Sequence, residues 1–140
     1  MIEFQQVTRT YGGRVAVDRL DLNVAEGELF AFLGPNGAGK TTSIKMIVGL
    51  LRPSSGRVRV CGCDVIEQPR EAKSQVSYVP DEPYLYDKLT GREFLKFIAD
   101  MYGLSRRDAG MQVASQIERF DLPDFVDELT EDLIRESEAR

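Results

Sequence analysis

Apolar and polar residues alternate along the first part of the chain, which is the pattern of strands with one buried face. The alternation occurs at residues 2–4, 20–24 and 58–60, and residues 76–79 are a further short strand candidate. Tyr11-Gly12-Gly13 marks a turn between the first two of these segments. The pattern therefore predicts several short strands, antiparallel in character, before residue 80.

One segment differs from these because all five of its residues are apolar. Residues 29–33 read Leu, Phe, Ala, Phe, Leu without a polar interruption. A continuous apolar run of this length is typical of a strand that is buried on both faces. We therefore expect residues 29–33 to form a central strand, with a neighbour on each edge.

Helical spacing appears first after residue 40 and then dominates from residue 90. Residues 44–51 repeat apolar side chains at helical spacing, and residues 52–56 end that helix in a turn. Thr90 and Glu93 have the spacing of a capping box. Three further helices are predicted after residue 90. The inner face of the first is formed by Phe94, Leu95, Ile98, Met101 and Tyr102, and that of the second by Val113, Ile117 and Phe120. The third begins at about Asp124, and its inner face is formed by Phe125 or Val126, Leu129 and Leu133. A sheet-rich part, 1–80, is thus followed by a helical part, 81–140.

Composition and charge narrow the function classes. The chain has 140 residues, of which 42% are hydrophobic, so an ordinary core is expected. It contains neither an apolar run of about 18 residues nor a basic, apolar leader, so we expect no membrane span and a cytoplasmic location. The net charge is −5, and the acidic residues concentrate in 121–140. The sequence has no basic stripe of the kind expected in a nucleic-acid-binding protein, so we expect no nucleic-acid partner.

The two cysteines do not indicate a metal site. Cys61 and Cys63 flank Gly62, and the chain has no histidine that could complete a tetrahedral set of ligands. A disulfide between such near neighbours is not expected in a reducing compartment. Two small residues on a hairpin is the better interpretation.

The strongest chemical signal is the loop that follows the apolar run. It fits the pattern G-x-x-x-x-G-K-[ST], between a predicted strand and a predicted helix. Its glycines let several backbone N–H groups converge on one anion, Lys40 can reach the β- and γ-phosphates, and Thr41 offers a hydroxyl to Mg²⁺. A plain glycine-rich turn is the alternative. The candidate nucleotide-binding residues are Gly34, Pro35, Asn36, Gly37, Ala38, Gly39, Lys40, Thr41 and Thr42.

Three further stretches accompany this loop in a characteristic order: residues 7–13, 52–58 and 78–80. With the loop, they resemble the ATP-binding cassette of ABC transporters over about residues 2–127. The resemblance implies an α/β fold, a P-loop NTPase of the ABC type, with a β-rich nucleotide-binding core in 1–80. Residues 81–140 would then be a linking loop and a partial helical subdomain.

The resemblance also implies roles for residues outside the loop. Tyr11 is similar to the aromatic residue that stacks on adenine, although it could be an ordinary exposed turn tyrosine. Val17 would lie beside the base, or serve only in the core. Thr42 is similar to a second hydroxyl residue that touches the α-phosphate.

Residue 81 departs from the family pattern. The family has a glutamine there that contacts Mg²⁺ and the attacking water, whereas this chain has Asp81. An aspartate could still approach the metal, but it cannot donate a hydrogen bond as an amide does, and a surface turn acid is the alternative. Tyr84, Leu85 and Tyr86 resemble the surface that meets a transmembrane partner, and packing onto the helical part is equally consistent with them.

Parts that the family uses for hydrolysis are not found in the sequence. There is no signature loop rich in Ser and Gly, no apolar strand ending in Asp-Glu and no histidine, so no catalytic residue is identified. A truncated cassette is the most economical interpretation. Its central strand would lack neighbours, so we expect exposed apolar surface and either low stability or self-association.

The resemblance implies an ATP-binding subunit, or a fragment of one, that binds ATP and Mg²⁺ to power solute transport. Its partners would be a transmembrane subunit and a second ATP-binding cassette, with the protein peripheral at the inner face of the cell membrane. The alternative is a module that binds nucleotide or a partner without hydrolysis. A nucleotide kinase or GTPase is a third interpretation, but the chain has no Asn-Lys-x-Asp sequence for guanine.

Overall fold

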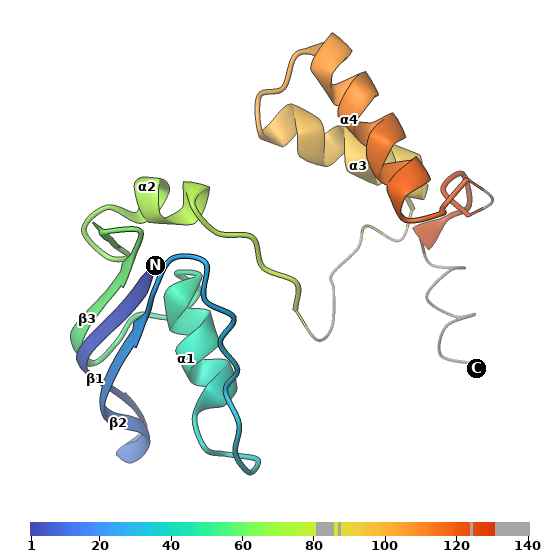
Figure 1. The fold of residues 1–140 in the computed structure, drawn as a ribbon. Coiled ribbons are helices and arrows are strands. Elements are labelled where there is room, and N and C mark those ends of the chain that lie inside the picture. Colours follow the sequence, from blue (N-terminus) through green and yellow to red (C-terminus); the bar gives the residue numbers. More distant parts are fainter. Residues whose placement is uncertain (81–85, 87, 124, 131–140) are drawn as a thin grey trace. The chain divides into compact units, whose positions relative to one another are not determined.

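The computed structural model describes residues 1–80, 86, 88–123 and 125–130 (Figure 1). The chain divides into two compact units, Met1–Val79 and Pro80–Arg140. Within the described ranges, no helix combines the length and the apolar character that crossing a membrane requires.

The first unit is a four-stranded antiparallel sheet with two helices. Its elements are β1 (Ile2–Tyr11), β2 (Arg14–Val24), α1 (Lys40–Ile47), β3 (Ser55–Val60), β4 (Cys63–Asp64) and α2 (Pro69–Ser74). The strand order is β2-β1-β3-β4. The strands predicted at residues 2–4, 20–24 and 58–60 are confirmed, whereas α2 was not predicted.

Two tight turns connect neighbouring strands. At the β1–β2 turn Gly12 and Gly13 have φ of 52° and 85°, and at the β3–β4 turn Cys61 and Gly62 have φ of 48° and 82°. Positive φ at both central residues matches the right-handed twist of the paired strands. The predicted hairpin at the cysteines is confirmed, and both thiols are free.

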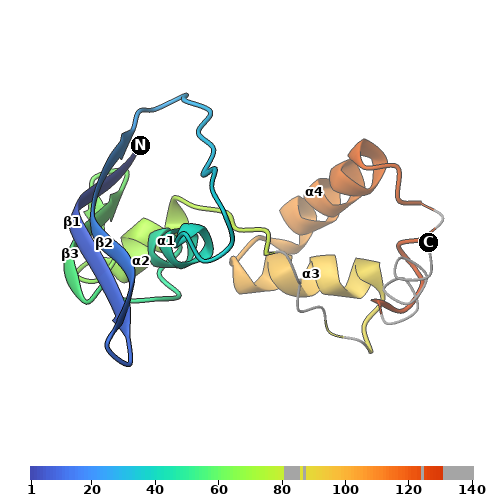
Figure 2. The same ribbon diagram turned by 90° about the horizontal axis from the view of Figure 1, so that it is seen from below.

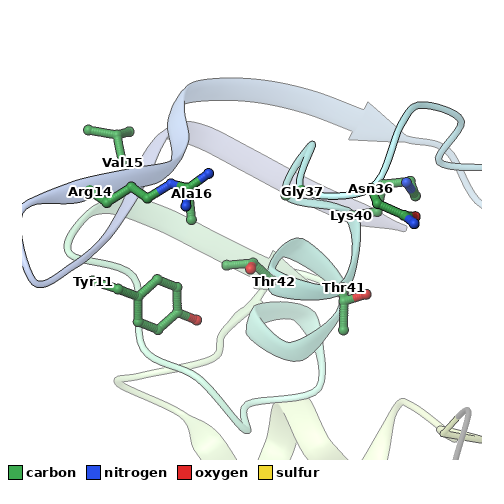
Figure 3. Close-up of a pocket in the computed structure, with 10 residues that line it drawn as sticks. Tyr11, Arg14, Val15, Ala16, Asn36, Gly37, Lys40, Thr41 and Thr42 are labelled. Carbon is green, nitrogen blue, oxygen red and sulfur yellow. The ribbon is translucent and has the colours of Figure 1, made fainter.

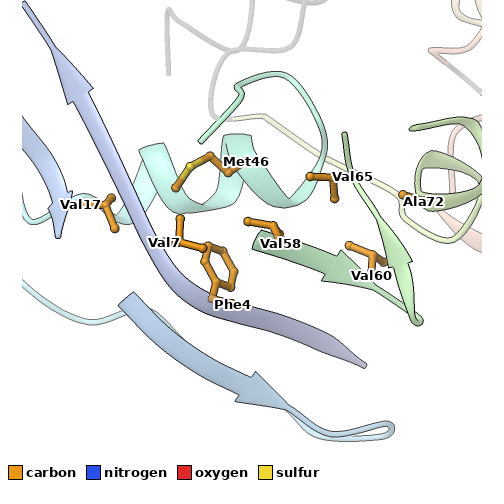
Figure 4. Close-up of a cluster of buried hydrophobic side chains, with 8 residues drawn as sticks. All are labelled: Phe4, Val7, Val17, Met46, Val58, Val60, Val65 and Ala72. Atoms are coloured by element: carbon orange, nitrogen blue, oxygen red, sulfur yellow. The ribbon is translucent and has the colours of Figure 1, made fainter. Parts of the chain in front are cut away.

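The core lies between the sheet and the helices, which cover the same face of it (Figure 2). Met46 of α1 is fully buried and lies over Val7 and Val58 (Figure 4). Phe4 and Val7 are both buried although they are three positions apart, an odd spacing that would place them on opposite faces of a regular strand. The reason is that β1 has a register shift between them and Gln6 adopts φ of 48°. This bulge returns the apolar side chains to the core face.

Two predicted strands are wrong. Residues 29–33 form no strand and pair with none of the described strands; Leu29 and Leu33 are 99% and 91% exposed. Residues 76–79 likewise form no strand. A central strand is stable only when neighbours satisfy its backbone on both edges, and no described segment supplies them. The expected exposure of apolar surface is therefore observed. The helix predicted over 44–51 ends at Ile47.

The second unit contains α3 (Gly91–Met101) and α4 (Arg106–Arg119). The capping box is confirmed, since the Thr90 hydroxyl accepts from the Glu93 N–H and the Glu93 carboxylate accepts from the Thr90 N–H. Ile117 is buried as predicted, but Phe120 is 64% exposed because α4 ends before it.

The predicted third helix does not begin near residue 124. Residues 125–128 form turns and a bend, and Leu129 pairs with Thr90 in an isolated bridge. Val126 is buried whereas Phe125 is exposed. Leu133 lies outside the described residues.

An exposed ion pair joins this segment to the start of α3. The Arg92 guanidinium donates to both carboxylate oxygens of Asp127, at 2.7 and 2.9 Å. This hydrogen bonding lowers the pKa of Asp127 and raises the pKa of Arg92.

Candidate functional site

The β1–β2 hairpin and the loop before α1 enclose a hollow of about 400 Å³ (Figure 3). Tyr11 and Arg14 come from the hairpin, whereas Thr41 and Thr42 come from the first turn of α1. The lining residues are Tyr11, Arg14, Val15, Ala16, Asn36, Gly37, Gly39, Lys40, Thr41 and Thr42. The structure thus brings together hairpin and loop residues that are 20 or more positions apart in sequence. The hollow has a size typical of small-molecule sites, about 300–1,000 Å³.

Gly39 is the position where the loop meets the sheet. It has φ of 85°, which only glycine adopts freely, and a Cβ there would lie 2.5 Å from the Ala16 carbonyl oxygen and 2.9 Å from Val17 Cγ2. Gly37 has φ of 84° but faces open space. The backbone at Gly39 therefore approaches β2 more closely than any side chain would allow, and this contact fixes the loop against the hairpin.

Lys40 folds back over its own loop. Its Nζ donates to the carbonyl oxygens of Gly34 and Pro35, at 2.6 and 2.7 Å, and the Ala38 N–H donates to the Pro35 carbonyl at 3.3 Å. Gly34, Pro35 and Ala38 are not among the residues that line the hollow; they shape the loop and orient the ammonium group. An incoming anion would compete with these two neutral carbonyl acceptors for the ammonium group. Both partners would then be ionised, so the bond to the anion would be stronger than the bond to a neutral carbonyl.

The N-terminus of α1 has donors to offer. The N–H of Ser43 makes the first helical bond, to the Gly39 carbonyl at 2.8 Å, so the N–H groups before it have no helical acceptor. The helix has no side-chain cap and no acidic residue in its first turn. The positive end of the helix dipole therefore faces the hollow without a competing carboxylate, which favours an anion.

Two hydroxyl groups stand beside these donors. Thr41 and Thr42 both line the hollow, so the predicted Mg²⁺ ligand lies at the predicted phosphate site. Asp81, the second predicted metal ligand, lies outside the described residues. In the part of the chain that the structure describes, no three Asp, Glu, Cys or His side chains cluster to hold a metal. Mg²⁺ in phosphate sites takes few protein ligands beside phosphate oxygens and water, so Thr41 fits that role.

Tyr11 is at the far end of the same hollow. Its side chain is 45% exposed, and the guanidinium carbon of Arg9 lies 4.5 Å from the centroid of its ring. Tyr11 lines the hollow whereas Arg9 does not. A flat ring at this position can stack on a planar ligand.

Val17 lies in the core and does not line the hollow, whereas its neighbours in β2 do. Its side chain is 8% exposed and belongs to the main hydrophobic cluster, whereas Val15 and Ala16 line the hollow. Sequence reasoning missed these two residues and Arg14. No motif marks these three residues. Only their position could have indicated them, because they follow the Gly12-Gly13 turn on β2, and Arg14 pairs with Tyr11 across the hairpin.

Comparison with known proteins finds similarity over nearly the whole chain. Residues 17–137 match the family described as ABC transporter. The chain is 36% identical over 133 residues to a probable multidrug ABC transporter ATP-binding protein, YbhF of Escherichia coli, covering 95% of this chain and 23% of that protein. It is 34% identical over 140 residues to an uncharacterized ABC transporter ATP-binding protein, YhaQ of Bacillus subtilis, covering all of this chain and 46% of that protein.

A solved structure agrees with these relatives. The chain superposes on an ATP-binding subunit of an ABC transporter with a TM-score of 0.80 at 30% identity, covering 91% of this chain and 53% of that one. The chain therefore spans less than half the length of both curated relatives and about half of the solved subunit.

Proposed function

The chain belongs to the ABC transporter ATP-binding family, and from this membership we propose that its hollow binds ATP together with Mg²⁺. The triphosphate would lie against the loop and the N-terminus of α1, with Lys40 on the β- and γ-phosphates and Thr41 on the metal. Thr42 would contact the α-phosphate. Tyr11 would stack on adenine, with Val15 and Ala16 beside it.

The single observation that carries this proposal is the placement of an aromatic ring and an anion-binding helix end around one hollow. Tyr11 belongs to β1 and Lys40 to α1, and both line the same space of about 400 Å³. A phosphate site alone would accept many anions. A planar stacking surface across from it selects a ligand with both a ring and a phosphate chain.

The wider role follows from family membership and is proposed on that basis. The unit that contains the hollow would be the nucleotide-binding core, and the unit after it a linking loop and partial helical subdomain. The protein would act at the cytoplasmic face of a membrane with a transmembrane subunit and a second cassette. Binding of MgATP would drive solute transport through that subunit.

Calorimetric titration of the chain with MgATP tests the binding proposal. We expect saturable binding that Lys40→Ala abolishes, because the substitution removes the ammonium group at the loop. Lys45→Ala is the matched control, since Lys45 is exposed on the same helix and does not line the hollow. No binding by the wild-type chain, or equal binding by Lys40→Ala, would contradict the proposal. Displacement by GTP as readily as by ATP would favour a different P-loop class.

A second candidate function is nucleotide binding without turnover by these 140 residues. The sequence has no histidine and no apolar run that ends in Asp-Glu, so the groups that would orient a water and accept its proton are not identified. Phosphate release from MgATP, compared with Lys40→Ala, separates the two candidates. Turnover that depends on Lys40 would contradict the second one.

A further inference from the structure

Arg9 has no role in the proposed site, yet its guanidinium group is held in one position. Nη1 donates to the Arg52 carbonyl oxygen at 3.0 Å, and the guanidinium carbon lies 4.5 Å from the centroid of the Tyr11 ring. Nε is buried and has no hydrogen-bond partner. A buried donor without an acceptor is unfavourable, so the Nη1 bond and a further favourable contact must offset its cost. The Tyr11 ring is the partner that the geometry supplies.

The backbone around Arg9 is bonded to the turn that follows α1. The Ser54 N–H donates to the Thr8 carbonyl at 2.8 Å, and the Ser54 hydroxyl accepts from the Thr10 N–H at 3.1 Å. Gly56 lies so close to β1 that a Cβ there would be 2.5 Å from the Gln5 carbonyl oxygen. Residues 52–56, which end the connection from α1 and begin β3, therefore anchor the cation.

A cation on one face of an aromatic ring changes what the other face can bind. The negative face of the ring attracts the guanidinium, and the cation draws the electron density of the ring toward itself. The opposite face becomes less negative, which suits an electron-rich planar ligand such as a purine. The cation also restrains a side chain that is 45% exposed at the end of a hairpin, so less conformational entropy is lost when a base stacks on it.

We infer that Arg9 is a positioning residue for the base: it supports the Tyr11 ring from behind and prepares the ring's free face to stack on adenine. This inference rests on the proposed function of the hollow. It adds that affinity for the base, as distinct from the phosphates, depends on a cation that does not touch the nucleotide. Residues 52–56 then contribute to base binding through Arg9.

The test compares a ligand that has the base with one that lacks it. Dissociation constants for MgATP and for magnesium tripolyphosphate are measured by calorimetry on the wild-type chain, Arg9→Met, Tyr11→Leu and the double variant. We expect Arg9→Met to weaken MgATP about two- to fivefold, the range of a cation–π interaction at a partly exposed site. Tripolyphosphate binding should not change. In the Tyr11→Leu background, Arg9→Met should have no further effect.

Two controls separate positioning from folding. Arg57→Met removes an exposed arginine from β3 and should leave both affinities unchanged. Arg9→Lys keeps the charge but loses the planar group, so MgATP affinity should fall between those of wild type and Arg9→Met.

Three results would overturn the inference while leaving the proposed function intact. They are an unchanged MgATP affinity in Arg9→Met, an equal loss for MgATP and tripolyphosphate, and an effect of Arg9→Met that persists without the Tyr11 ring. If the wild-type chain binds neither ligand, the proposed function itself fails and the inference fails with it.

Discussion

The two segments that flank the phosphate loop differ in structure and in burial: one forms a packed helix, and the other forms no strand and has exposed leucines. After the loop, α1 forms a helix whose Met46 is completely buried against the sheet. Before the loop, residues 29–33 form no strand and pair with none of the described strands, and Leu29 is 99% exposed. Both segments carry the apolar pattern that their predicted element requires.

The difference teaches that the two elements depend on different partners. A helix satisfies its interior backbone hydrogen bonds within its own residues, so α1 needs only one apolar surface to pack on. A central strand needs two neighbouring strands for its backbone and two covered faces for its side chains. The sheet β2-β1-β3-β4 offers α1 its surface, but no described segment offers residues 29–33 an edge.

The largest expected effect is on the packed side of the comparison. Met46→Ala leaves a cavity beside Val7 and Val58, and should lower the free energy of unfolding by about 2–5 kcal/mol. Met46→Leu nearly conserves the side-chain volume and should cost less than about 1.5 kcal/mol. Urea denaturation followed by circular dichroism measures both. A loss of under about 1 kcal/mol for Met46→Ala would mean that α1 is not held by this core.

The second prediction concerns the joint between the loop and the sheet. Gly39→Ala forces a Cβ against the Ala16 carbonyl, so the loop must move and MgATP affinity should fall about tenfold or more. Gly27→Ala is the matched control, because Gly27 has φ of 76° but nothing within 4 Å of a Cβ. Calorimetry should show near wild-type affinity for the control. Equal losses in both variants would assign the effect to backbone strain rather than to the close approach.

For the exposed segment 29–33, we expect a substitution to change self-association of the chain rather than its stability. Leu33→Ser should change the free energy of unfolding by no more than about 0.5 kcal/mol, because the side chain is 91% exposed. It should reduce self-association in sedimentation velocity, since a large apolar side chain leaves the surface. Leu50→Ser is the control, as Leu50 is also exposed but lies outside the 29–33 segment. A strictly monomeric wild-type chain would remove the basis for this prediction.

The smallest effect is expected for a contact that neither buries a surface nor completes a sheet. Asp127→Asn weakens the exposed pair with Arg92 and should destabilise the chain only slightly at neutral pH. The folded-state pKa of Asp127 is lowered, so its contribution is present above the ordinary carboxylate pKa, about 3.9, and is lost as pH falls through the lowered value.

Thermal melting of the wild-type chain and Asp127→Asn across pH measures this dependence. The small difference at pH 7 should vanish at strongly acidic pH, while Asp100→Asn serves as a control for an acid on α3. A difference that grows on acidification would contradict the sign.

Local signals identified much of the fold in advance. The alternation around Phe4, the Gly12-Gly13 turn and the Thr90 capping box each specify structure through neighbours a few residues away, and each is confirmed. The predictions for Phe120 and for residues 29–33 are wrong for two reasons. The burial of Phe120 depends on where its own helix ends, and the burial of residues 29–33 depends on neighbouring strands that no described segment supplies. The bulge at Gln6 left no pattern that alternation could reveal.

The candidate site divides in the same way. Residues 34–42 and Tyr11 were identified from motif and resemblance, and the structure places most of them around one hollow. Arg14, Val15 and Ala16 carry no motif, so only the path of the hairpin shows that they line it. The support of Tyr11 by Arg9 depends on a ring face and a carbonyl 43 residues away, which no linear pattern encodes.

The sequence by itself determined the phosphate loop, the helix that follows it, the turns and the helix caps, because each depends on backbone conformation and hydrogen bonds within a few residues. The tertiary structure alone decided that Val17 lies in the core, that Gly39 contacts β2, and that residues 29–33 pair with none of the described strands. Those outcomes depend on which distant surfaces meet. Burial and strand pairing are properties of two segments together, so a pattern within one segment does not determine them.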